Sequence, residues 1–243
     1  MNPFIKNHKQ KSIFVTAGYP KLDSLAGQIK LLEKYNIDFI EIGIPFSDPL
    51  ADGPTIQKTS EVAIKNGMNL PLLFEQLAKI KTETPLVLMG YLNPVLTYGI
   101  EKFVSSCKDC GIASVILPDL SFEIYARFYK SIFDQYQLPI SFLITPQTET
   151  ERIEKMVTQC KESFIYLVSD NSTTGTDSEM NLNECRLKSI YALMDNTPLM
   201  IGFGIKTKSD IEKVHQFADG AIIGSAYLRA LEVGTENAFL EQL

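Results

Sequence analysis

The sequence predicts a single-domain (β/α)8 barrel, an α/β fold of the TIM-barrel type, over residues 1–243 with an extra helix between strands two and three. Eight short apolar segments rich in β-branched residues recur along the chain, and amphipathic stretches of helical period lie between them. Segments that are apolar throughout are typical of parallel strands covered on both faces. Eight such units in 243 residues match the usual size of a closed barrel.

The strands are expected at residues 13–16, 39–42, 86–89, 114–117, 140–144, 164–168, 199–201 and 221–223. Leu22, Leu25 and Ile29 mark the apolar stripe of the first helix. Helices at 56–66 and 70–81 both precede strand three, and further helices are expected at 103–110 and 124–133. A doubly wound open sheet is the rival fold, but residues 16–20 (TAGYP) lack the dinucleotide pattern G-x-G-x-x-G.

Composition excludes several classes of protein. The chain has 23 Lys plus Arg against 29 Asp plus Glu, a net charge of -6 that disfavours nucleic acid as a partner. The basic residues at 6–11 are interpreted as a solvated N-terminal segment. No stretch approaches the roughly 20 apolar residues of a membrane span, and the N-terminus lacks the apolar core of a signal peptide. We therefore expect a cytoplasmic protein that does not bind membranes.

The four cysteines include one C-x-x-C pair, Cys107 and Cys110, which is a possible zinc or redox site. The two histidines lie at no finger-like spacing, and both cysteines fall on an apolar helical face that ends at Gly111. The sequence thus favours core packing for these cysteines and no metal site.

Two carboxylates near the second strand are the candidate catalytic groups. Glu41 lies inside an apolar strand, where it either pairs with a buried base or backbone amides or acts as an acid and base. Asp52 follows in a loop constrained by three prolines, where it either caps the helix near Pro54 or faces the pocket. Two carboxylates in unlike environments can divide proton transfer, and Glu41 should be the drier of the two.

Glycines after the last strands predict a phosphate site. Gly202 and Gly204 follow strand seven, and Gly224 with Ser225 opens a short helix after strand eight. Loops at these places form the phosphate site of many such barrels, because exposed amides and a helix N-terminus attract an anion. Gly175, after strand six, is a candidate further donor.

Aromatic residues at strand ends either fill the barrel or form the wall of a pocket for a flat apolar substrate. They are Phe14, Tyr166 and Phe203, and Phe203 is the best candidate for a ligand contact because glycines flank it. The polar loop at 170–179 is interpreted as a closing lid, with a plain surface loop as the alternative.

Residues 41–54, which read EIGIPFSDPLADGP, closely resemble the signature of the tryptophan synthase α-subunit family. Further matches in register are FVTAGYP at 14–20, GYLNP at 90–94, LPDL at 117–120, GFGI at 202–205 and GSA at 224–226. The resemblance therefore extends over nearly the whole chain.

This resemblance implies a lyase that splits indole-3-glycerol phosphate into indole and glyceraldehyde 3-phosphate by a retro-aldol reaction, without a cofactor of its own. It assigns the acid/base to Glu41 and the indole-orienting carboxylate to Asp52. It also places Phe14, Tyr166 and Phe203 in the indole pocket, makes Thr174 the lid threonine, and assigns phosphate binding to Gly175, Gly204, Gly224 and Ser225. The implied partner is a β subunit that carries pyridoxal phosphate in an αββα complex and receives indole, faced by the loops of Asn93 and Asp119.

The chain departs from the family pattern in the lid, where DNSTTG at 170–175 replaces RAGVTG, and at 118–121, where PDLS replaces PDLP. Lid closure and its coupling to the partner are therefore expected to differ in strength. Two alternatives remain open: another phosphate-binding barrel enzyme, such as an isomerase or a Schiff-base aldolase using Lys206, or an allosteric subunit with little activity of its own.

Overall fold

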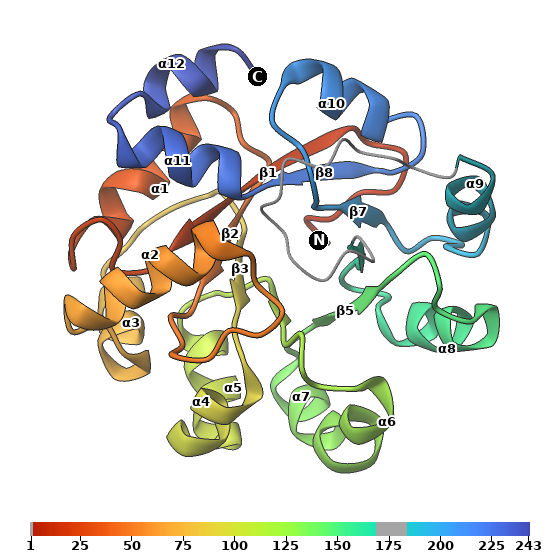
Figure 1. Cartoon of the computed structure of the whole chain (residues 1–243). Helices are drawn as coiled ribbons and strands as arrows, with labels where there is room; N and C mark the ends of the chain where they lie inside the picture. The colour runs from red at the N-terminus through yellow and green to blue at the C-terminus, as the bar shows by residue number, and fades with distance from the viewer. Residues whose placement is uncertain (1, 169–183) are drawn as a thin grey trace.

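A computed structural model describes residues 2–168 and 184–243, and it contains a closed barrel of eight parallel strands in chain order (Figure 1). The strands are β1 (Gln10–Thr16), β2 (Phe39–Gly43), β3 (Leu86–Met89), β4 (Ser114–Ile116), β5 (Ile140–Ile144), β6 (Ile165–Leu167), β7 (Leu199–Ile201) and β8 (Gly220–Ile223). β8 pairs with β1 and closes the barrel. The predicted fold class and all eight predicted strands are confirmed, with three strands matching at both ends.

Helices surround the barrel (Figure 1). They are α1 (Leu25–Lys34), α2 (Pro54–Lys65), α3 (Leu70–Leu77), α4 (Leu92–Tyr98), α5 (Ile100–Asp109), α6 (Phe122–Ile124), α7 (Lys130–Tyr136), α8 (Thr150–Gln159), α9 (Glu184–Ala192), α10 (Lys208–Val214), α11 (Ser225–Glu232) and α12 (Glu236–Glu241). A π-helical turn, η1 (Tyr125–Tyr129), joins α6 to α7. The predicted extra helix before β3 is confirmed as the pair α2 and α3.

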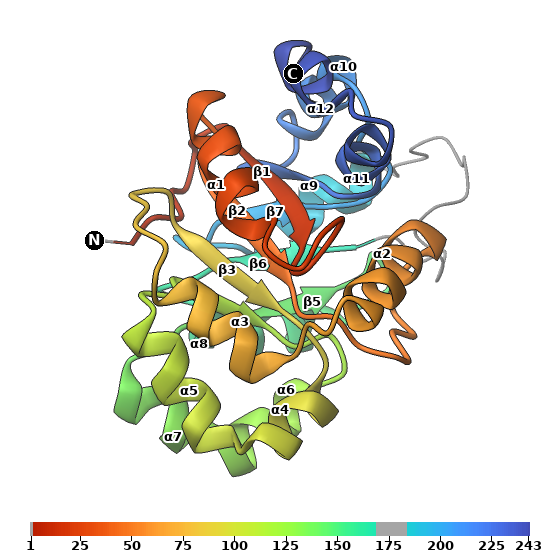
Figure 2. The ribbon, with the colours of Figure 1, turned by 90° about the vertical axis from the view of Figure 1, so that its left-hand side faces the viewer.

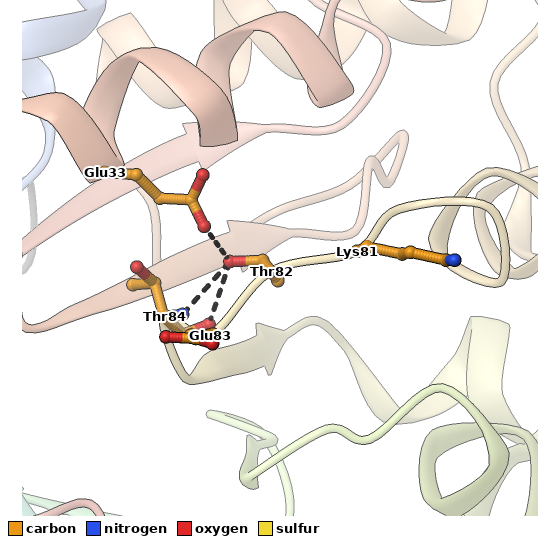
Figure 3. Close-up of a pocket in the computed structure, with 5 residues that line it drawn as sticks. All are labelled: Glu33, Lys81, Thr82, Glu83 and Thr84. Carbon is orange, nitrogen blue, oxygen red and sulfur yellow. Dashed lines mark hydrogen bonds between the residues drawn. The ribbon is translucent and has the colours of Figure 1, made fainter.

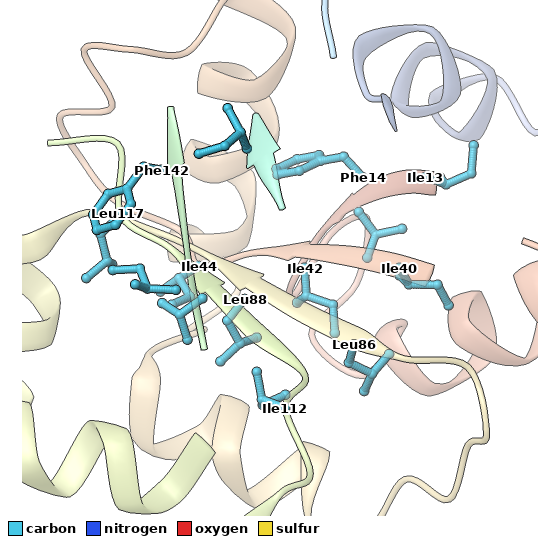
Figure 4. Packing of buried hydrophobic residues seen from close by; sticks show 14 of the residues in the cluster. Ile13, Phe14, Ile40, Ile42, Ile44, Leu86, Leu88, Ile112, Leu117 and Phe142 are labelled. Carbon is cyan, nitrogen blue, oxygen red and sulfur yellow. The ribbon is translucent and has the colours of Figure 1, made fainter. Parts of the chain in front are cut away.

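Alternation along the strands divides their side chains between two cores. Ile40 pairs in register with Leu86, and Ile42 with Leu88; all four belong to the apolar layer between strands and helices (Figure 4). The residues between them point the other way and fill the barrel. This inner core consists of Phe4, Phe39, Val87, Ile116, Phe164, Tyr166, Met200 and Ile222. Glu41 therefore shares its side of β2 with Phe39, toward the barrel interior.

The N-terminal segment closes the end of the barrel where the strands begin, on the left of Figure 2. The Phe4 ring packs 5.4 Å from that of Phe39 and 4.9 Å from that of Phe164. Lys6 lies 3.4 Å from the carboxylate of buried Asp219, and its Nζ sits 3.8 Å from the ring centre of Tyr191. The interpretation of residues 6–11 as a solvated segment is correct for the exposed residues 7–9 but wrong for Lys6, which pairs with a buried charge, and for residues 10–11, which begin β1.

Removing Asp219 should destabilise the fold strongly. Its carboxylate accepts hydrogen bonds from the Asn7 amide (2.7 Å), the Tyr191 hydroxyl (2.8 Å) and the Leu199 amide (2.9 Å), and it is fully buried. Asp219→Ala would leave these donors and Lys6 without their partner, at a cost of about 3–5 kcal/mol. Urea unfolding measures this loss.

Asp134→Ala is the control, because it removes an exposed partner of Lys130 and should change stability little. Equal losses of stability in the two variants would contradict this role of Asp219.

The C-x-x-C pair lies at the end of α5, with Cys107 inside the helix and Cys110 as its C-terminal cap residue. Cys107 is fully buried, and Cys110 is partly buried with its thiol 3.8 Å from the carbonyl oxygen of Phe74. Among the described residues, no three His, Cys, Asp or Glu side chains are grouped so that they could hold a metal ion. Within the same residues, no helix has the length and apolar character needed to cross a membrane.

Candidate active site

Glu41 is a fully buried carboxylate. It lies in the middle of β2, opposite Phe14 on β1, and it is 0% exposed. Within residues 2–168 and 184–243, neither of its carboxylate oxygens has a hydrogen-bond partner. The structural alternative, in which a buried base or backbone amides satisfy Glu41, is therefore wrong for the described part of the chain. A buried polar group left unsatisfied is expensive, so it indicates a functional position.

The pKa of Glu41 is raised to about 8, mainly by burial and in smaller part by the nearby charge of Asp52. At neutral pH this side chain therefore holds its proton most of the time, unlike a carboxyl group in water. Glu41 can donate a proton to a substrate and then accept one in return.

Asp52 faces inward from the loop between β2 and α2, and it is 8% exposed. Its role as a helix cap is ruled out here, because the cap of α2 is Gly53 and no side chain bonds to the helix start. The carboxylate instead accepts a hydrogen bond of 3.1 Å from the hydroxyl of Tyr91. Burial raises the pKa of Asp52 to about 6, while this hydrogen bond lowers it, so Asp52 is mostly ionised at neutral pH.

The two carboxylates thus occupy different environments. Glu41 is drier and mostly protonated, whereas Asp52 is hydrogen-bonded and mostly charged. Pairs whose pKa values are pushed apart in this way can act as a proton donor and an electrostatic stabiliser in one reaction. Tyr91 is the site residue that sequence reasoning missed, although it lies in the GYLNP segment that was matched to the family.

Two aromatic rings fill spaces that glycines leave open beside the carboxylates. A Cβ atom on Gly43 would lie 2.3 Å from Cζ of Phe14, and one on Gly202 would lie 2.0 Å from the hydroxyl oxygen of Tyr166. The Tyr166 hydroxyl donates a hydrogen bond of 3.4 Å to the Gly202 carbonyl. Burial raises the pKa of Tyr166, and the charges of Glu41 and Asp52 act in the same direction.

Phe203 and the candidate phosphate residues lie beyond the ends of β7 and β8. Phe203 is partly buried against the outer core, and Gly204 has φ +67°, a conformation that L side chains rarely adopt. Gly224 caps the N-terminus of α11, which begins at Ser225 and is the short helix expected there. β7 and β8 are neighbours, so these glycines lie on adjacent strand ends. Thr174, Gly175 and the rest of the predicted lid at 170–179 lie outside the described residues.

A separate surface pocket lies at the opposite end of the barrel. It is lined by Glu33 at the end of α1 and by residues 81–84, which precede β3. Figure 3 shows the Thr82 hydroxyl donating to Glu33 and accepting from the Thr84 amide. Because β3 starts here and ends near the carboxylates, this pocket is distinct from the candidate site.

Comparisons with known proteins agree on one family. The family model described as "Tryptophan synthase alpha chain" matches residues 5–242. A curated protein of that name from Christiangramia forsetii is 47% identical over 96% of this chain and 92% of its own. The structure of the Campylobacter jejuni tryptophan synthase alpha subunit superposes with a TM-score of 0.84 at 31% identity, covering 98% of this chain and 95% of that one. A Mycobacterium tuberculosis tryptophan synthase structure reaches 0.85 at 27% identity, covering 96% and 90%.

Proposed function

The chain belongs to the tryptophan synthase alpha chain family, and on that premise we propose that Glu41 and Asp52 perform the bond cleavage of this family. The protein is a carbon–carbon lyase of tryptophan biosynthesis, which splits indole-3-glycerol phosphate into indole and glyceraldehyde 3-phosphate and acts with a β subunit. The observation that carries the proposal is the buried Glu41, which has no hydrogen-bond partner among the residues that the structure describes, beside a second buried carboxylate of lower pKa.

In the proposed reaction, the protonated Glu41 delivers its proton to indole C3. This step turns the ring into a cationic imine-like form, into which the electrons of the breaking carbon–carbon bond can flow. Asp52, already ionised, accepts a hydrogen bond from the ring N–H and stabilises the positive charge that develops there. The Glu41 carboxylate then takes the proton from the side-chain hydroxyl as it becomes the aldehyde, which restores the starting state.

The remaining site residues are proposed to hold the two ends of the substrate. Phe14, Tyr166 and Phe203 contact the indole ring, and Thr174 meets Asp52 when the lid closes. Gly175, Gly204, Gly224 and Ser225 bind the phosphate through backbone amides, with Ser225 at the positive end of α11. The support for this division is that Phe14 and Tyr166 lie beside the carboxylates, whereas Gly204 and Gly224 follow the adjacent strands β7 and β8.

In this cleavage protons pass only between the substrate and Glu41, Asp52 stays ionised, and the electron pairs shift within the substrate, so no net oxidation or reduction occurs. We therefore propose that this chain uses no cofactor, that pyridoxal phosphate belongs to the β subunit of an αββα complex, and that the loops of Asn93 and Asp119 face that subunit. The cytoplasmic location expected from composition stays a prediction.

Indole release from indole-3-glycerol phosphate, measured with and without a β subunit, tests the function. Activity in either assay supports it, and no activity in both would contradict it. Borohydride added with the substrate separates the Schiff-base alternative, because an adduct on Lys206 would support an aldolase whereas the carboxylate mechanism forms none. Measurable turnover without a β subunit would argue against a purely allosteric subunit.

Gly224→Ala should weaken binding of the phosphorylated substrate. A Cβ atom at this position meets nothing closer than Cβ of Phe14 at 3.6 Å, so the fold can accept it. Gly224 is the cap residue of α11, and we expect a methyl group there to crowd a phosphate bound at the start of this helix. We expect KM for indole-3-glycerol phosphate to rise about tenfold, with binding of free indole nearly unchanged. Equal losses for both ligands would contradict a phosphate site. A change at Gly204 is a poorer test, because its positive φ strains any side chain.

A further inference from the structure

The hydroxyl of Tyr91 is held between two groups of the loop that carries Asp52. It accepts a hydrogen bond of 3.0 Å from the Ala51 amide and donates one of 3.1 Å to Oδ2 of Asp52. A phenol has a single hydrogen to donate. Because the Ala51 amide is itself a donor, it leaves that hydrogen for the carboxylate. The contact therefore favours the charged form of Asp52.

Tyr91 is held in place by the packing of its ring and by the anchoring of its backbone. Its ring is 6% exposed and packs against the ring of Phe46, with centres 5.3 Å apart. The next residue, Leu92, begins α4, and its amide donates to both carboxylate oxygens of Asp119 at 2.9 and 3.1 Å. The Tyr91 hydroxyl is therefore held in a fixed position, because the residue that carries it is anchored at the start of α4.

The Asp52 carboxylate has an alternative set of hydrogen-bond donors at the start of α2. The helix begins at Pro54, its cap Gly53 supplies no side-chain acceptor, and its first turn contains no acidic residue. The free amides at a helix start attract a carboxylate from a neighbouring residue. Glu41 also acts on Asp52. When Glu41 is ionised, its negative charge repels the Asp52 carboxylate from the pocket.

We propose that Tyr91 is a positioning residue for the cleavage reaction, whose hydroxyl holds the Asp52 carboxylate in the pocket and away from the start of α2. The proposal rests on the role assigned to Asp52 above. The titratable groups that act on this carboxylate from the described elements are Glu41 on β2, Tyr91 before α4 and Tyr166 on β6. Of these, only the Tyr91 hydroxyl favours the ionised carboxylate through a hydrogen bond.

Tyr91→Phe removes the hydroxyl and keeps the ring against Phe46. We expect kcat to fall about tenfold with a smaller change in KM, since a hydrogen bond to a charged group is lost. The acid limb of the kcat/KM profile should move to higher pH, because Asp52 is then harder to ionise. Carboxyl NMR of the ligand-free protein should show the same upward shift for Asp52. Tyr98→Phe is the matched control, since that hydroxyl lies on α4 but bonds to Ser106, and it should move neither readout.

A double-mutant cycle with Asp52→Asn distinguishes the outcomes. If Tyr91 acts through Asp52, adding Tyr91→Phe to Asp52→Asn should cost almost nothing further. A loss from Tyr91→Phe of the same size in both backgrounds, or an unmoved Asp52 titration in the single variant, would overturn the proposal. Full activity of Asp52→Asn would instead refute the function proposed for Asp52 itself, so the two failures are separable.

Discussion

Glu41→Gln is expected to lower kcat for indole release by about 10³- to 10⁴-fold while the barrel stays folded. Glutamine fills the same space, but its amide neither gives a proton to indole C3 nor takes one from the substrate hydroxyl. A positioned acid/base group contributes about 10²- to 10⁴-fold, and Glu41 is proposed to act in both proton transfers. Steady-state indole release measures the effect, with binding of a substrate analogue as the control for a formed site. Turnover near that of the wild type would refute the assignment.

The same substitution should stabilise the protein at high pH. The pKa of Glu41 is raised from 4.5 to about 8, so the folded state binds this proton more tightly than the unfolded state does. The contribution of Glu41 to stability is therefore fully present below about pH 4.5 and is lost as the pH rises toward 8. Urea unfolding at pH 9 should find Glu41→Gln more stable than the wild type by a few kcal/mol, and at pH 4 nearly equal to it. A wild type more stable than the variant at pH 9 would mean that Glu41 is not buried without a partner.

The barrel was predictable because its strands carry a local signal. Apolar β-branched runs such as residues 86–89 and 140–144 match β3 and β5 at both ends. The helix α4 was not predicted, because it is short and includes Pro94. That proline falls in the first turn, where its missing N–H costs no intrahelical hydrogen bond. The π-helical turn η1 likewise has no known sequence signature to reveal it.

The candidate site was only partly predictable, for a different reason. Glu41 stands out as a charge in an apolar strand, and this signal is local. Asp52 could be read equally well as a helix cap, since its partner Tyr91 lies 39 residues further along the chain. The pairing of Lys6 with Asp219 spans a still greater separation, so the basic segment resembles a solvated tail. Contacts between distant elements depend on barrel closure and not on local pattern.

Asp52→Asn is expected to lower kcat by about 10²-fold, with KM changed less. Asparagine can still accept a hydrogen bond from the indole N–H, but it lacks the negative charge that stabilises the ring as C3 gains a proton. The loss should therefore fall on the transition state more than on the bound substrate, and kcat and kcat/KM should decline together. Asn69→Asp is a control for general electrostatic effects. It adds a negative charge at the exposed cap residue of α3, outside the candidate site.

The pH profile separates the roles of the two carboxylates. In the wild type, kcat/KM should fall on the acid side as Asp52 is protonated near pH 6 and on the alkaline side as Glu41 loses its proton near pH 8. These limbs belong to an interacting pair, because the charge of Asp52 contributes to the raised pKa of Glu41. Asp52→Asn should remove the acid limb. It should also move the alkaline limb to lower pH, since Glu41 then ionises without a neighbouring negative charge. An acid limb that persists in Asp52→Asn would show that another group titrates there. The assignment of the ionised role to Asp52 and the protonated role to Glu41 would then be wrong.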